Sequence, residues 1–116
     1  MERVFNMYRL KAGVSIEEYI KFSQDLDQVV TAHRPGVLSF EAHIIAGSAE
    51  GSEVAIGADP TALSSNVPYH VIETIDVANW AAWMRVVASD EMAPVRDAWE
   101  LVADSTTTRM ILGRPI

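Results

Sequence analysis

Residues 39–47, SFEAHIIAG, alternate between apolar and polar side chains. In an extended chain this alternation separates the side chains onto two faces. The apolar set is Phe40, Ala42 and Ile44, and the polar set is Ser39, Glu41 and His43. We expect a strand over residues 37–45 with its apolar face against a core. Its polar face meets either water or an enclosed site where a carboxylate and an imidazole move protons.

The same alternation recurs in three other stretches. We expect strands at residues 3–10, 69–77 and 106–112, which are rich in β-branched and aromatic side chains. A long connection over residues 46–68 is rich in Gly, Ser, Ala, Asp, Asn and Pro. Connections of this length are often lids, and residues 53–56 within it are able to pair as a short strand.

Helical spacing of apolar residues predicts three helices. The first runs from a capping box, Ser15 with Glu18, to about His33 and ends at Pro35-Gly36. The others cover residues 80–87 and 92–102, and Pro94 delays the regular start of the last. The order β-α-β-β-α-α-β predicts an α+β, ferredoxin-like fold, a four-stranded antiparallel sheet with helices on one face.

Composition excludes several classes of protein. A chain of 116 residues predicts one domain, residues 1–116. A net charge of −7 with nine scattered Lys and Arg argues against nucleic acid. There is no Cys, no phosphate-binding Gly motif and no stretch resembling a signal peptide or membrane span. We expect a cytoplasmic protein that uses neither metal nor organic cofactor and binds no membrane.

Several of the predicted strands are apolar on both sides, which a sheet with one face in water would not be. In residues 3–10, Phe5 and Met7 alternate with Val4, Tyr8 and Leu10. Helices cover only one face of a ferredoxin-like sheet, so a second subunit is the simplest cover for the other.

Three stretches carry a resemblance to a known family. YRLKAGV at 8–14, PGVLSFE at 35–41 and YHVIETIDV at 69–77, with a Trp-bearing helix after the last, resemble the dimeric α/β-barrel superfamily. Within it the chain resembles the small REDY-like proteins of prodiginine and bisindole clusters, end to end except at residues 46–68. The resemblance implies a homodimer with its two sheets face to face, and an aromatic substrate that is indole- or pyrrole-derived or polycyclic.

Three residues are candidates for proton transfer. Glu41 and His43 share a face, so the carboxylate is placed to tune the imidazole as a general base. His70 joins them if both strands line one cavity. The alternative for all three is a structural role at the barrel rim or in solvent.

Four residues are candidates for substrate binding. Asn6 and Tyr8 place polar groups on an apolar face, as small-molecule pockets do, although Tyr8 alternatively serves in packing. Trp83, like Trp80 and Trp99, lies at the spacing of core residues on a predicted helix, which favours a role in packing. If one of these indole rings lines the cavity, it favours a flat aromatic substrate. Arg109 either holds a carboxylate or oxyanion or pairs with Glu73 or Glu41.

The candidate residues favour cofactor-independent acid–base catalysis, and the REDY-like resemblance implies that the substrate is an aromatic intermediate of secondary metabolism. Together they predict an enzyme that cyclises or isomerises such an intermediate. Two alternatives stay open. One is a cofactor-free monooxygenase of the antibiotic-biosynthesis type, and the other is a non-catalytic protein that binds a reactive metabolite.

Overall fold

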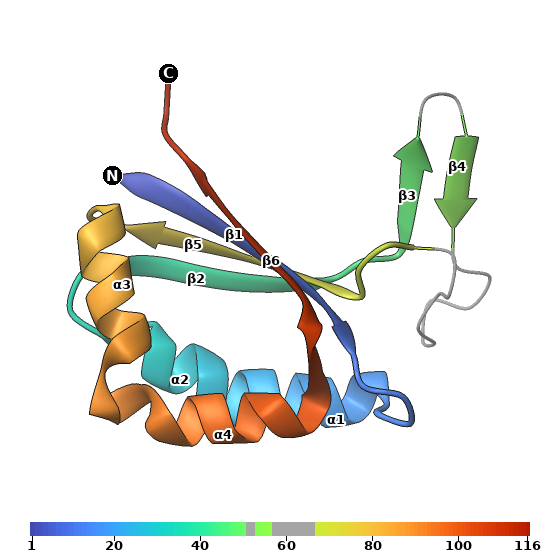
Figure 1. The fold of residues 1–116 in the computed structure, drawn as a ribbon, viewed down its shortest axis with the longest axis horizontal. Helices are drawn as coiled ribbons and strands as arrows, with labels where there is room; N and C mark the ends of the chain where they lie inside the picture. The colour runs from blue at the N-terminus through green and yellow to red at the C-terminus, as the bar shows by residue number, and fades with distance from the viewer. Residues whose placement is uncertain (51–52, 57–66) are drawn as a thin grey trace.

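The computed structural model describes residues 1–50, 53–56 and 67–116. Four strands form its main sheet: β1 (Glu2–Leu10), β2 (Val37–Ile44), β5 (Val71–Val77) and β6 (Ala103–Gly113). Their order is β2-β5-β1-β6, and every neighbouring pair is antiparallel. All helices lie against one face of this sheet (Figure 1). The predicted α+β, ferredoxin-like fold is confirmed.

The first predicted helix is three segments in sequence: α1 (Ile16–Phe22), the π-helical η1 (Ser23–Asp27) and α2 (Gln28–Thr31). The capping box is confirmed, because the Glu18 amide donates to Ser15 Oγ at 3.1 Å and the Glu18 carboxylate accepts from the Ser15 amide. After α2, Gly36 adopts a φ of +90°, and a Cβ there would lie 2.8 Å from Ala82 Cβ. Only glycine therefore fits this turn without displacing Ala82.

The second helical region consists of α3 (Trp80–Ala88), the 3₁₀ turn η2 (Asp90–Met92) and α4 (Ala93–Val102). Asn79 caps α3 by accepting a hydrogen bond from the Ala82 amide at 2.8 Å. Pro94 falls in the first turn of α4, where a missing backbone donor costs nothing. The delayed helix start predicted from Pro94 is confirmed. No helix among the described residues is long and apolar enough to cross a membrane.

The two faces of the sheet differ sharply in exposure. On β5 the odd-numbered residues are buried and the even-numbered ones are half-buried. The register places Ala42, Glu73, Asn6 and Met110 side by side on the face that packs against the helices, which we call the helical face. It places His43, Ile72, Met7 and Arg109 in the next row, on the opposite face, which we call the open face.

A separate hairpin occupies part of the predicted connection 46–68. Strand β3 (Gly47–Glu50) pairs antiparallel with β4 (Glu53–Ile56), so the predicted pairing of residues 53–56 is confirmed. Residues 51–52 and 57–66 lie outside the described residues. A lid formed by this connection stays a prediction from the sequence.

Candidate active site

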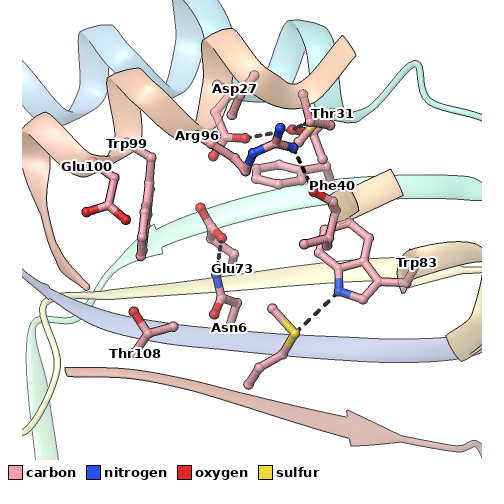
Figure 2. A pocket seen from close by; sticks show the side chains of 14 residues that line it. Asn6, Asp27, Thr31, Phe40, Glu73, Trp83, Arg96, Trp99, Glu100 and Thr108 are labelled. Atoms are coloured by element: carbon pink, nitrogen blue, oxygen red, sulfur yellow. Dashed lines mark hydrogen bonds between the residues drawn. The ribbon is translucent and has the colours of Figure 1, made fainter. Parts of the chain in front are cut away.

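A cavity of about 220 Å³ lies between the helical face of the sheet and the helices above it. Figure 2 shows side chains from both layers that line it. Its polar floor carries Asn6 and Glu73, while Asp27 and Thr31 enter from the first helical region. Such a cavity exceeds the roughly 150 Å³ that holds a benzene molecule in an engineered apolar core. The cavity is therefore large enough to hold a small organic molecule.

Glu73 is the central polar group of this cavity. It lies on the interior strand β5 between the buried Val71 and Ile75, and 4% of its surface is exposed. Its Oε1 accepts a hydrogen bond from Asn6 Nδ2, and its Oε2 accepts one from the Tyr8 hydroxyl, both at 2.9 Å. Burial and the nearby Asp27 carboxylate raise the pKa of Glu73 well above its usual range.

Asp27 reaches the cavity from the π-helical segment. Its carboxylate accepts a hydrogen bond from the Thr31 hydroxyl at 2.7 Å, and its charge acts on Glu73 across the same cavity. Burial raises the pKa of Asp27 as well. Two carboxyl groups that line one buried site oppose each other's ionisation, so the pair binds a proton more tightly than an isolated carboxyl group does.

The π-helical segment explains how Asp27 comes to face the sheet. Tyr19, Ser23, Asp27 and Thr31 recur every four residues, and all four are buried. A regular α-helix repeats every 3.6 residues, so a four-residue stripe would drift around its axis. The wider turn at Ser23–Asp27 reduces that drift, and such π-bulges are frequent at functional sites.

Tyr8 lies beneath Glu73, inside the core. Its hydroxyl contacts the Tyr19 hydroxyl at 3.1 Å, and its ring meets Trp99 edge-on with centroids 5.2 Å apart. Burial, with Glu73 second, raises the pKa of Tyr8, and burial also raises that of Tyr19. Both side chains therefore stay neutral phenols, which can donate and accept protons but do not act as phenolate bases.

Aromatic side chains form much of the cavity wall, as Figure 2 shows for Phe40, Trp83 and Trp99. The Trp83 indole N–H donates to Met110 Sδ at 3.3 Å, which fixes the ring. Arg96, an exposed residue of α4, also lines the cavity and donates to the carbonyls of Val87 and Ser89. Flat apolar walls around a pair of carboxyl groups are an arrangement that can hold a flat ligand next to a proton donor.

The structure brings three of the predicted site residues together here. Asn6 and Trp83 line the cavity, and Tyr8 supports Glu73 from below. Trp99 also reaches the cavity, whereas Trp80 is partly exposed at the start of α3. The expectation that Asn6 and Tyr8 share a face with Val4 and Leu10 is confirmed by their burial.

Glu41, His43 and Arg109 lie on the open face instead. Glu41 and His43 are exposed on the edge strand β2, and Arg109 is exposed on the opposite edge strand β6. Strands β5 and β1 separate the two edges, which puts about 14 Å between them at roughly 4.8 Å per strand. In this chain Arg109 therefore pairs with neither predicted partner: Glu73 points to the other face, and Glu41 is at the far edge.

His70 is buried just before β5 but does not meet His43 in a shared cavity. Its Nδ1 accepts a hydrogen bond from the Leu10 amide at 2.8 Å, and its own backbone amide donates to the Tyr8 carbonyl. Burial, and secondarily the charge of Arg9, lowers the pKa of His70. This geometry describes a neutral imidazole that joins two strand ends.

Sequence reasoning missed Asp27 and Glu73 as functional residues. The signal was present in both cases: Glu73 interrupts the apolar series Val71, Ile75, Val77, and Asp27 lies four residues after Ser23 on a buried stripe. A carboxylate on a core-facing position needs a partner. Within residues 1–50, 53–56 and 67–116, no three His, Asp or Glu side chains are grouped closely enough to hold a metal ion.

The sequence of this chain matches a known protein family. The sequence model of the REDY-like protein HapK matches residues 2–116. The chain belongs to the REDY-like HapK family. No curated protein sequence matches this chain.

Solved structures support the fold of this REDY-like chain. The crystal structure of HapK from Hahella chejuensis superposes with a TM-score of 0.72 at 19% identity, covering 100% of this chain and 93% of that one. A dimeric ferredoxin-like protein of unknown function from Thermobifida fusca gives 0.66 at 10% identity, covering 98% and 90%. SnoaB from Streptomyces nogalater, a cofactor-independent oxygenase, gives 0.65 at 11% identity, covering 99% and 92%. At these identities the three structures establish the fold alone.

Proposed function

We propose that this protein is a cofactor-independent enzyme of secondary metabolism that cyclises or isomerises an aromatic intermediate by acid–base catalysis. The observation that carries the proposal is the buried Asp27–Glu73 carboxyl pair on an aromatic-walled cavity. A carboxyl group with a raised pKa holds its proton near neutral pH, as a general acid must. Asp27 is the carboxylate that takes a proton back.

The walls and floor of the cavity favour an indole- or pyrrole-derived substrate over an aliphatic one. Trp83, Trp99 and Phe40 offer flat surfaces for a fused ring. Asn6 Oδ1 is a buried acceptor without a hydrogen-bond partner among the described residues. The N–H of an indole or pyrrole would satisfy that acceptor after a small shift of its neighbours.

A homodimer is part of this proposal. The open face carries Phe5, Met7, Ile72 and Ile111 in two neighbouring rows, and 46% of Ile111 is exposed in the single chain. A dimeric ferredoxin-like protein is among the structural neighbours. Pairing the open faces of two copies would bury this apolar strip and place Glu41, His43 and Arg109 near the interface. A cytoplasmic location stays a prediction from the sequence.

The test is a deuterium wash-in assay. The purified protein, without added cofactor and under anaerobic conditions, is incubated in deuterium oxide with a series of indole and pyrrole ketones. Mass spectrometry then measures deuterium at the carbon next to the carbonyl group. We expect incorporation by the wild type and its loss in Asp27→Asn, because Asp27 removes the proton. Equal incorporation with and without protein would overturn the proposal.

A second candidate is a cofactor-independent oxygenase, which is the activity of SnoaB, a protein with this fold. Such an enzyme would turn over only in air and would place label from ¹⁸O₂ in its product. Tight binding of an indole with neither exchange nor oxygenation would instead identify a binding protein.

A further inference from the structure

A second cavity, of about 230 Å³, lies on the other side of the first helical region, against β2. Tyr19, Ser23 and Gln28 line it from the helical side, and Ala42 and Ile44, on the helical face of β2, line it from the strand. Tyr19 and Ser23 thus stand between this cavity and the buried residues behind the active site.

A line of buried hydroxyl groups runs from the active-site cavity to the second cavity. It starts at Glu73 Oε2, which is 2.9 Å from the Tyr8 hydroxyl, and continues to the Tyr19 hydroxyl at 3.1 Å. Ser23 lies one helical turn after Tyr19 and lines the second cavity beside it. The Ser23 oxygen in turn accepts from Gln28 Nε2 at 2.9 Å, which holds it in place at the second cavity.

We propose that Tyr8, Tyr19 and Ser23 form a proton relay between Glu73 and the second cavity. The relay rests on the proposed acid–base function, and it adds a route by which Glu73 exchanges protons while a substrate fills the active-site cavity. Each member is a hydroxyl group, which donates one hydrogen and accepts others, so the chain can pass a proton without ionising a side chain for long.

Each proton that leaves Glu73 is replaced by one that enters the relay from solvent. Once Glu73 has given its proton to a substrate atom, the Tyr8 hydroxyl gives its proton to Oε2. The Tyr8 oxygen receives the proton of Tyr19, Tyr19 that of Ser23, and Ser23 one from solvent. Every hydroxyl ends with one hydrogen, one proton has entered from solvent, and no electron is transferred. The raised pKa values of Tyr8 and Tyr19 agree with hydroxyls that remain protonated between transfers.

The relay is tested by infrared spectroscopy on the whole protein saturated with indole, which blocks the active-site cavity. The protonated carboxyl of Glu73 gives a C=O stretching band, assigned by its absence in Glu73→Gln, that shifts on exchange into deuterium oxide. Tyr19→Phe and Ser23→Ala should each slow this shift by about tenfold or more, because only local opening then exposes the carboxyl. Tyr69→Phe, a tyrosine outside the relay, is the matched control and should leave the rate unchanged.

One result would contradict the relay, and another would contradict the protonated state of Glu73. A band that shifts equally fast in wild type, Tyr19→Phe and Ser23→Ala would overturn the relay and leave the proposed function intact. The absence of any Glu73-dependent band in the wild type would overturn the protonated acid on which the proposed function rests. Should Tyr19→Phe fold poorly by circular dichroism, Ser23→Ala decides alone, since it removes only one hydroxyl.

Discussion

The helical and open faces of one sheet place similar residues in different chemical environments. Glu41 pairs with Thr74, the direct neighbour of Glu73, yet the two glutamates point to opposite faces. Glu73 is enclosed by the helices and hydrogen-bonded to Asn6 and Tyr8, whereas Glu41 is exposed in the single chain. A shift of one residue along a strand therefore decides between a buried carboxyl group with a raised pKa and an exposed side chain.

The largest difference between the faces is expected in activity. Glu73→Gln removes the exchangeable proton but keeps the shape of the side chain, and should lower deuterium wash-in by about 10²- to 10⁴-fold. Glu41→Gln makes the same chemical change on the open face and should alter the rate less than about twofold, as surface changes usually do. Equal losses in the two variants would show that both faces take part in the reaction.

A second pair of variants compares packing on the two faces. Ile75 is buried on the helical face, so Ile75→Ala should reduce the free energy of unfolding by about 2–5 kcal/mol at any protein concentration. Ile111 lies on the open face, so Ile111→Ala should act through dimer formation and weaken stability mainly at low protein concentration.

Urea unfolding at several concentrations and analytical ultracentrifugation measure both effects. A monomeric wild type, or an Ile111→Ala effect independent of concentration, would remove the open face as a dimer interface.

Substitution of His70 tests whether its imidazole, at the end of the sheet, has a structural role. Its Nδ1 accepts the Leu10 amide, so His70→Ala leaves a buried donor unpaired and should cost about 1–3 kcal/mol of unfolding free energy. Wash-in activity per folded molecule should stay at the wild-type level. Lost activity with unchanged thermal stability would instead restore His70 as a catalytic candidate.

The smallest expected effect is a slope in stability with pH. The pKa of Glu73 is higher in the folded protein than in the unfolded chain, where it is near 4.3. At a pH between the unfolded and the folded pKa, Glu73 therefore carries a proton in the folded protein but not in the unfolded chain. The free energy of unfolding should therefore fall as pH rises through this window, by at most about 1.4 kcal/mol per pH unit from this group. Glu73→Gln should have a shallower dependence in urea titrations at each pH. Identical slopes would mean that Glu73 is ionised in the folded protein.

The sequence predicted the fold better than the site, for physical reasons. Alternation in β1, β2 and β5 reports directly which residues face the core, and the Ser15–Glu18 capping box marks where the first helix begins. The same alternation put Glu73 on the core face. The role of a carboxyl group there depends on its hydrogen-bond partners, Asn6 and Tyr8, which are far away in sequence. Asp27 depends on a π-helical turn that shifts its direction, and a helical-spacing pattern does not reveal such a turn.

The central claim is that substrate binds on the helical face, beside Glu73, and not between the two sheets of a dimer. The most direct measurement is a crystal structure of the protein soaked with indole. We predict ring density between Trp83 and Trp99, with a polar contact to Asn6 or Glu73 at the cavity floor. Density on the open face beside Glu41 and His43, with the helical-face cavity empty, would contradict the account.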